Sequence, residues 1–190
     1  VDLRKIYMLS ASSGIWQIIF EHIKKEIDIS KEYKDIEKAT MNAIFNQLTR
    51  SVNISRIIKI LEDNRIKCCI LKGPTLASLY KEPYARISSD MDIYIKDDVD
   101  KACEILKENN FEIMDRWAGS HHIKCINKQC GMIELHTELF DKVVNDLWFN
   151  RADYIDLEFV PFEFEGVKCH TLNPTDSILF NYLHFVKHYI

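Results

Sequence analysis

Apolar side chains recur at helical spacing over the first 64 residues of the chain. They fall into two runs, Ile15, Ile18, Ile19, Ile23 and Ile27, and then Ile36, Ala39, Ala43, Ile44 and Leu48. Such spacing places each run on one face of a helix, so we predict helices whose isoleucines form a core. A further helix is predicted to begin at Asn53 or Ser55 and to end near Asn64.

The pattern changes after residue 64 to short apolar runs and alternating segments separated by turn residues. These predict strands over 66–71, 91–95, 111–114, 121–126, 132–139, 159–164 and 167–171. Helices are predicted over 75–80 and 99–108, and a last one begins at Asn173-Pro174-Thr175. The chain is therefore predicted to be α+β, with a mixed β-sheet flanked by helices and a helical N-terminal part.

This organisation predicts three regions along the chain. They are a helical N-terminal region over 1–64, an α/β core over 65–172, and the start of a C-terminal helical region over 173–190. The sequence opens abruptly at Val1 and stops at Ile190 inside an apolar-periodic segment. We therefore expect a fragment of a longer polypeptide with a truncated C-terminal region.

Net charge and composition limit which binding partners and which cellular compartment suit the chain. The formal net charge of −4 argues against duplex DNA as a partner, although a local basic pocket for a triphosphate remains compatible with it. No apolar run is long enough to span a bilayer. A disulfide between Cys125 and Cys130 is one possibility for the six cysteines, but reduced, buried thiols and a cytoplasmic setting fit best.

Two aspartates mark the first candidate site. Asp90 and Asp92 are spaced i, i+2 in a β-branched run, so they project from the same face of the predicted strand. Neighbouring carboxylates repel by roughly 1–4 kcal/mol, and a hard divalent cation with oxygen ligands relieves that repulsion. The alternative is a pair of solvated residues at an exposed strand edge.

A glycine turn and a third carboxylate extend this candidate site. Gly73 lies between a predicted strand and a helix N-terminus, where backbone N–H groups favour a phosphate. Glu134 supplies a third carboxylate if the strand over 132–139 lies beside the strand over 91–95, and Glu138 on the same face is its competitor. Together these residues predict a two-metal site for phosphoryl transfer.

Two basic residues lie near the candidate site in the sequence, one before Gly73 and one before Asp90. Lys72 either steers a phosphate or is an ordinary surface lysine whose stem lies on apolar neighbours. Arg86 either clamps a phosphate with two parallel hydrogen bonds or braces the aspartates by charge pairing.

The histidines permit a metal interpretation and a simpler one. Adjacent His121 and His122 face opposite ways on a strand, and no recognised zinc motif includes them or His136. A structural or substrate-side role for His122 and His136 is therefore preferred. His184 and His188 share one helix face, where packing against the sheet is preferred to metal binding.

The spaced motifs resemble a known family. Gly73 followed by Asp90-Met91-Asp92 resembles the signature of the nucleotidyltransferase superfamily with the DNA polymerase β-like fold. Over roughly residues 53 to 190, the chain is similar to the bacterial uncharacterised nucleotidyltransferase-like family. The matching elements are Leu71-Lys72-Gly73, Leu76, Tyr80, Pro83, Arg86, Asp90-Met91-Asp92-Ile93, His121-His122, Glu134-Leu135-His136, and His184 with Lys187-His188.

The resemblance implies a fold, a chemistry and a set of site residues. It implies a small twisted nucleotidyltransferase-like sheet flanked by helices, with Mg²⁺ or Mn²⁺ as the cofactor. The catalytic metal ligands would be Asp90, Asp92 and Glu134, and the residues that bind the nucleoside triphosphate would be Lys72, Gly73, Arg86 and Ser89. Two departures from the superfamily pattern are Pro74 directly after the glycine, which has no N–H to donate, and a glutamate at the third acid.

Three functions follow from these observations. The first is a nucleotidyltransferase that moves a nucleoside monophosphate from a triphosphate, ATP among them, to an unidentified small molecule, peptide, protein or RNA, with release of pyrophosphate. The second is a catalytically inactive nucleotide- or ligand-binding module of the same fold, which the Pro74 departure motivates. The third is an interaction domain in which the isoleucines over 15–27 form a partner surface.

Overall fold

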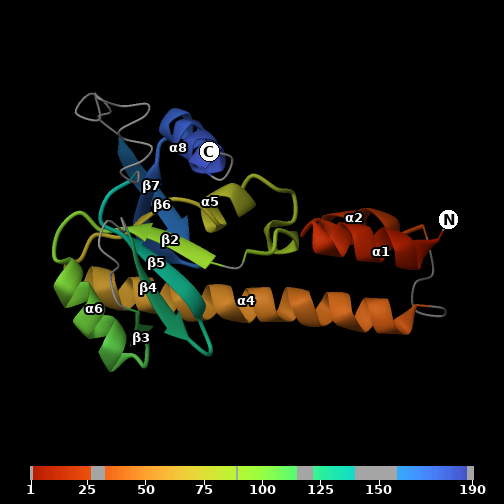
Figure 1. Cartoon of the computed structure of the whole chain (residues 1–190), viewed down its shortest axis with the longest axis horizontal. Helices are drawn as coiled ribbons and strands as arrows, with labels where there is room; N and C mark the ends of the chain where they lie inside the picture. Colours follow the sequence, from red (N-terminus) through yellow and green to blue (C-terminus); the bar gives the residue numbers. More distant parts are fainter. Residues whose placement is uncertain (1, 27–32, 89, 115–121, 140–157, 188–190) are drawn as a thin grey trace.

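The computed structural model describes residues 2–26, 33–88, 90–114, 122–139 and 158–187. Before the sheet, the described residues form the helices α1 (Leu3–Ser12), α2 (Trp16–Ile23) and α4 (Lys34–Asp63). As Figure 1 shows, α1 and α2 lie against the N-terminal half of α4, and the second half of α4 runs along the sheet. The helical N-terminal part of the predicted α+β fold is therefore confirmed.

The sheet contains seven strands in the order β3-β4-β5-β2-β1-β7-β6 within the described residues. The strands are β1 (Cys69–Ile70), β2 (Asp90–Tyr94), β3 (Glu112–Ile113), β4 (His122–Asn127), β5 (Gly131–His136), β6 (Phe159–Phe164) and β7 (Val167–Leu172). Two pairs, β2 with β5 and β1 with β7, are parallel, and the other pairs are antiparallel. The prediction of a mixed sheet flanked by helices is confirmed.

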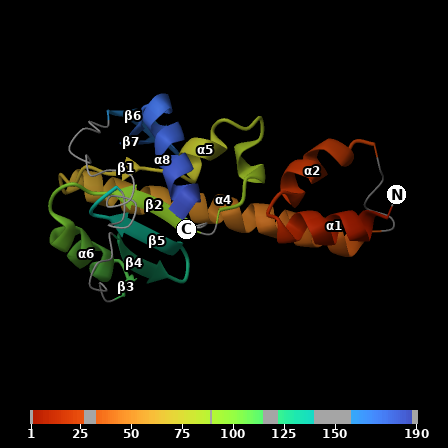
Figure 2. The same ribbon diagram turned by 45° about the horizontal axis from the view of Figure 1, so that its top comes forward.

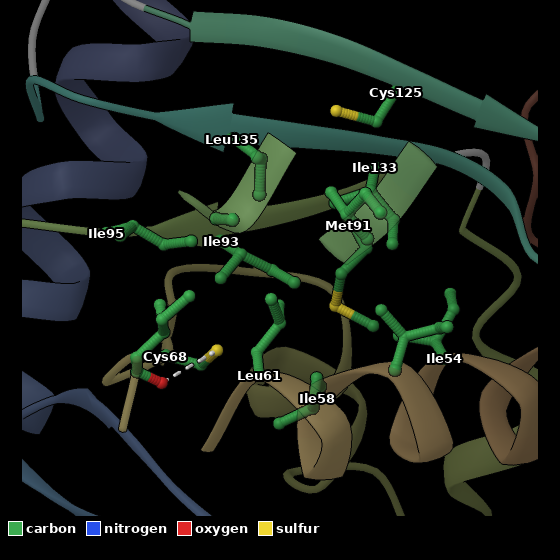
Figure 3. Packing of buried hydrophobic residues seen from close by; sticks show 14 of the residues in the cluster. Ile54, Ile58, Leu61, Cys68, Met91, Ile93, Ile95, Cys125, Ile133 and Leu135 are labelled. Atoms are coloured by element: carbon green, nitrogen blue, oxygen red, sulfur yellow. Dashed lines mark hydrogen bonds between the residues drawn. The ribbon is translucent and has the colours of Figure 1, made fainter. Parts of the chain in front are cut away.

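Helices cover both faces of this sheet. On one face, α4 and α6 (Val99–Glu108) pack on β2, β5 and their neighbours, and Figure 3 shows Ile54, Ile58 and Leu61 beneath Met91 and Ile93. On the other face, α8 (Pro174–Lys187) buries Phe180 against β1 and β7. Figure 1 shows α8 above the strands and α4 below them, and in the tilted view of Figure 2 α8 passes in front of α4. The alternation of β2 thus turns Met91 and Ile93 toward α4 and leaves Asp92 on the α8 face.

The prediction of a separate helix from Asn53 or Ser55 is wrong, because α4 is continuous from Lys34 to Asp63. The sequence between Leu48 and Ile57 holds no glycine or proline, so nothing ends the helix there. Ile36 joins the N-terminal cluster, and Ile58 joins the core of the sheet. The helix therefore contributes to both cores, and the division of the chain at residue 64 stays a prediction.

In the N-terminal core, aromatic residues of α2 are buried more deeply than the isoleucines that were predicted on that helix. Trp16 is fully buried and Phe20 is 4% exposed, whereas Ile15 is 46% exposed. The indole N–H of Trp16 donates to Thr40 Oγ1 at 2.6 Å and so ties α2 to α4. Ile18, Ile19 and Ile23 are half-buried at the edge of this cluster, Ala39 and Leu48 are exposed, and Ile27 lies outside the described residues. A large aromatic ring closes the gap between two short helices better than a branched aliphatic side chain.

All six cysteines are free and buried, as the sequence predicted. Cys68 packs with the α4 face of the sheet and Cys69 with the α8 face, so neighbouring thiols do point to opposite sides. Burial raises the pKa of the Cys169 thiol to about 12. Such thiols stay protonated and inert in the folded chain.

Candidate active site

The pairing of β2 with β5 brings three carboxylates together. The two strands are parallel, and Asp92 lies opposite Glu134 in their register. One oxygen from each of Asp90, Asp92 and Glu134 lies within 4.8 Å of the others. Glu134 was predicted to join the site only if its strand lies beside the strand of Asp92, and this pairing is present. The competitor Glu138 lies beyond the end of β5 and is exposed.

Asp92 is the buried centre of this group. Its side chain is fully buried, with His136 Nε2 at 2.8 Å from Oδ1 and Lys72 Nζ at 3.2 Å from Oδ2. Burial alone would raise the pKa of Asp92, but the hydrogen bond with His136 and the charge of Lys72 outweigh it and lower the pKa below its ordinary value. Asp92 is therefore ionised, and its negative charge is available to a cation.

Lys72 joins the carboxylates to the C-terminal helix. Its ammonium lies 2.9 Å from Nε2 of His184 on α8, in addition to its contact with Asp92. The imidazole of His184 accepts this hydrogen bond, because an ammonium can only donate. Lys72 is therefore not an ordinary surface lysine, whereas its role in steering a phosphate stays a prediction. His184 makes a hydrogen bond at the sheet.

Glu134 is surrounded by nitrogen atoms from β4 and β5. Its carboxylate lies 3.8 Å from His122 Nε2, 3.7 Å from Lys124 Nζ and 3.9 Å from His136 Nε2. His122 and His136 are cross-strand partners, with ring centroids 5.4 Å apart. Both histidines that the sequence singled out therefore belong to the carboxylate group itself.

The glycine turn lies directly beside the start of β2. Gly73 is the N-cap of the short helix α5 (Pro74–Ala77) and has φ +83°, a conformation that favours glycine. A Cβ at this position would lie 3.8 Å from the carbonyl oxygen of Asp90. The Oγ1 of Thr75 in the same turn is buried and has no hydrogen-bond partner among the described residues.

Arg86 holds this turn in a way that neither sequence interpretation anticipated. It follows the short 3-10 helix η1 (Pro83–Ala85) and donates from Nη1 to the carbonyl oxygen of Gly73 at 3.3 Å. The guanidinium has further N–H groups beyond this one hydrogen bond. Ser89, the remaining predicted nucleotide-binding residue, lies outside the described residues, as do His121 and His188.

A residue that the sequence reasoning missed, Arg50 of α4, positions the strand ends. Its guanidinium donates to the carbonyl oxygens of Ser88 at 2.7 Å, Cys130 at 2.8 Å and Met132 at 3.1 Å. It thereby ties the start of β2 to the start of β5, where the carboxylates converge. The signal was present, because Arg50 lies on the apolar stripe of α4, four residues before Ile54.

We expect Gly131→Ala to destabilise the chain more than Gly166→Ala. Both glycines have φ +77°, so both variants carry the strain of a left-handed alanine, roughly 1 kcal/mol. A Cβ at Gly131 would also lie 2.9 Å from the guanidinium of Arg50, whereas Gly166 has nothing within 4 Å. Urea unfolding of the two variants measures the difference, and equal midpoints would contradict the fixed position of Arg50.

A cavity of about 310 Å³ adjoins the site on the side of α4. Asp90, Gly73 and Arg86 line it together with polar and apolar residues of α4, α5 and β6. Asp92 and Glu134 do not line it. The cavity therefore meets the carboxylate group only at Asp90.

A family model described as an uncharacterised nucleotidyltransferase matches residues 1–190 of the chain. The chain belongs to this family. Membership confirms the family that the spaced motifs indicated, and it supports nucleotidyl transfer as the general chemistry.

Comparison with other known proteins adds one similar structure. This is the crystal structure of an antigenic nucleotidyltransferase-like protein from Paracoccidioides brasiliensis, at 20% identity and a TM-score of 0.41. The match covers 66% of this chain and 61% of that one, so the chain spans less than two thirds of that protein. No protein of curated function matches. Within the described part of the chain, no helix combines the length and apolar character that a membrane crossing requires.

Proposed function

We propose that the chain transfers a nucleoside monophosphate from a nucleoside triphosphate to an acceptor and releases pyrophosphate, with Mg²⁺ or Mn²⁺ as its cofactor. The observation that carries this proposal is the register of β2 and β5, which gathers the oxygens of Asp90, Asp92 and Glu134 within 4.8 Å. We also propose that the family lies in the DNA polymerase β-like superfamily, since the glycine turn precedes the paired aspartates as in that signature.

The residues present fit a hard divalent cation. Three carboxylates supply oxygen ligands, and the buried Oδ2 of Asp92 has only the ammonium of Lys72, at 3.2 Å, as its partner among the described residues. Asp90, Asp92 and Glu134 would hold the metal. When bound, the metal would neutralise charge on the reacting phosphates and lower the pKa of the attacking group.

The residues around the carboxylates have separate roles in this proposal. Gly73 lets a phosphate approach the backbone at the start of α5, where Lys72 and Arg86 supply positive charge on either side. His136 holds Asp92 in its ionised form and fixed orientation. The acceptor oxygen would attack the α-phosphorus as the bond to pyrophosphate breaks, in the in-line geometry common to such transfers.

The acceptor is a small molecule, a peptide, a protein or an RNA. Duplex DNA is disfavoured by the net charge of −4. A cytoplasmic setting is proposed because all six cysteines are free and buried.

A second candidate function is nucleotide or ligand binding without transfer. Pro74 removes one backbone donor from the glycine turn, and Lys72 together with His136 already neutralises Asp92. A module of this kind would bind the triphosphate and metal at the same residues. It would leave the bond to pyrophosphate intact.

One paired assay tests both functions. We expect the melting temperature to rise with a nucleoside triphosphate only when Mg²⁺ or Mn²⁺ is present, because the ligand binds only the folded state. With label in the α-phosphate, label transfer and pyrophosphate release should accompany this binding. Asp90→Asn should lose both signals, whereas Glu138→Gln, at an exposed carboxylate beyond β5, should keep them.

The outcomes separate the two functions. Metal-dependent binding without pyrophosphate release, tested with each triphosphate, would favour the binding module. No metal-dependent binding of any triphosphate would contradict both functions.

A further inference from the structure

We infer that His122, Glu134 and His136, with Asp92 at their side, form a binding site for a divalent transition-metal ion. The site shares Glu134 and Asp92 with the carboxylate group, but it adds two imidazole nitrogens that Mg²⁺ does not need. The inference goes beyond nucleotidyl transfer and does not depend on it.

The first support is the strand register. His122 of β4 lies directly opposite His136 of β5, and Glu134 precedes His136 by two residues on the same face. These three residues therefore gather on one face of two adjacent antiparallel strands. Because strands hold side chains more rigidly than loops, such a site is largely formed before an ion arrives.

The second support is distance. His122 Nε2 and His136 Nε2 lie 3.8 Å and 3.9 Å from the two oxygens of Glu134, and one ligand atom from each residue lies within 4.8 Å of the others. Ligands of one ion at bond lengths of about 2.1 Å stand roughly 3.0–3.4 Å apart. Small side-chain rotations are enough to close the difference.

The third support is that Asp92 offers a fourth ligand. Nε2 of His136 lies 2.8 Å from Oδ1 of Asp92, as a hydrogen bond. An ion bound at this nitrogen would replace the shared proton and, with a small outward shift of the carboxylate, would have Oδ1 as a further ligand. Lys72 lies at the other oxygen of Asp92, so it does not block this side.

The chemical class of the ion follows from the ligands. Two imidazole nitrogens with one or two carboxylates suit Zn²⁺, Co²⁺ and similar ions, whereas Mg²⁺ prefers oxygen ligands and retains its waters. Lys124 also lies near Glu134, at 3.7 Å, but its side chain is 49% exposed. It can therefore turn toward solvent when an ion binds to Glu134. The side chain of His136 is only 1% exposed, so the ion would sit in a low-dielectric setting.

Titration with Co²⁺ tests the inference, because nitrogen ligation changes its visible absorption. The titration is run on the metal-free chain in excess Mg²⁺, which competes for the shared oxygen ligands of Asp92 and Glu134 but not for the imidazole nitrogens. We expect Co²⁺ to bind despite the Mg²⁺, and His122→Ala to weaken this binding at least about tenfold. His22→Ala is the matched control, since His22 is exposed on α2 and its Nδ1 pairs only with the carbonyl oxygen of Ile18 among the described residues.

A second variant guards against misfolding. His122→Phe keeps an aromatic ring beside His136 but removes the ligand, and its melting temperature without metal reports the fold. We expect the same loss of Co²⁺ binding in this variant. The inference is overturned if Mg²⁺ displaces Co²⁺ completely, or if a folded His122 variant binds Co²⁺ as wild type does. Transfer activity is measured separately, so failure here leaves the proposed function standing.

Discussion

We expect Asp92→Asn to abolish the proposed nucleotidyl transfer and also to destabilise the fold. A carboxylate that holds the metal contributes several kcal/mol of transition-state stabilisation, so we expect a rate loss of roughly 10³-fold or more. The variant also leaves the ammonium of Lys72, whose side chain is 17% exposed, facing a neutral amide. Breaking such a partly buried pair should lower the free energy of unfolding by about 1–3 kcal/mol.

The stability difference between wild type and Asp92→Asn should depend on pH. The pKa of Asp92 is lowered in the folded chain, so its ionised form adds stability above the ordinary aspartate pKa of about 3.9. This stability is lost as the pH falls through the lower pKa of the folded state. Urea unfolding should therefore separate wild type from variant at pH 7 and bring them together in acid.

Glu138→Gln is the control for both effects, because Glu138 is exposed and lies beyond the end of β5. It should leave the rate of transfer and the urea midpoint unchanged. If the Asp92→Asn variant transfers nucleotide at the wild-type rate, the carboxylate pair has no catalytic role.

Arg50→Met should be the second most damaging substitution. It removes three hydrogen bonds to carbonyl oxygens and leaves the starts of β2 and β5 without their shared donor. Charge-assisted bonds of this kind suggest a loss of about 2–4 kcal/mol in the free energy of unfolding. Transfer should also fall, because Asp90 and Glu134 would no longer be held in a fixed relation.

Arg56→Met is the matched control for Arg50, since Arg56 lies on the same helix with its side chain exposed. Its urea midpoint should stay close to that of wild type. If Arg50→Met unfolds at the same urea concentration as Arg56→Met, the three hydrogen bonds do not support the site.

The local chemistry of the site could be predicted from sequence because it follows from short spacings. The i, i+2 spacing of Asp90 and Asp92 set both carboxylates on one face, and the core contacts of Met91 and Ile93 agree with that alternation. Gly73 also occupies the turn that its sequence position indicated, with a positive φ. Glu134 could be named only on condition of a strand pairing, which the register then supplied.

The rest depended on contacts between distant segments. Arg50 reaches Cys130 and Met132 across 80 and 82 residues, and Lys72 reaches His184 across 112. No local pattern encodes such partners, although a charged residue on an apolar helix face is a usable signal. The exposed Ile15 and the buried Trp16 show a similar limit, because spacing alone does not say which apolar residue faces a partner helix.

The proposed function requires a cation site made by the three carboxylates beside Gly73. A crystal structure of the chain with Mn²⁺ and a non-hydrolysable nucleoside triphosphate tests it directly through the anomalous signal of the metal. We expect a peak within about 2.2 Å of oxygens from Asp90, Asp92 and Glu134, with the phosphates against the turn at Gly73. Nucleotide bound elsewhere, or metal bound away from these carboxylates, would contradict the account.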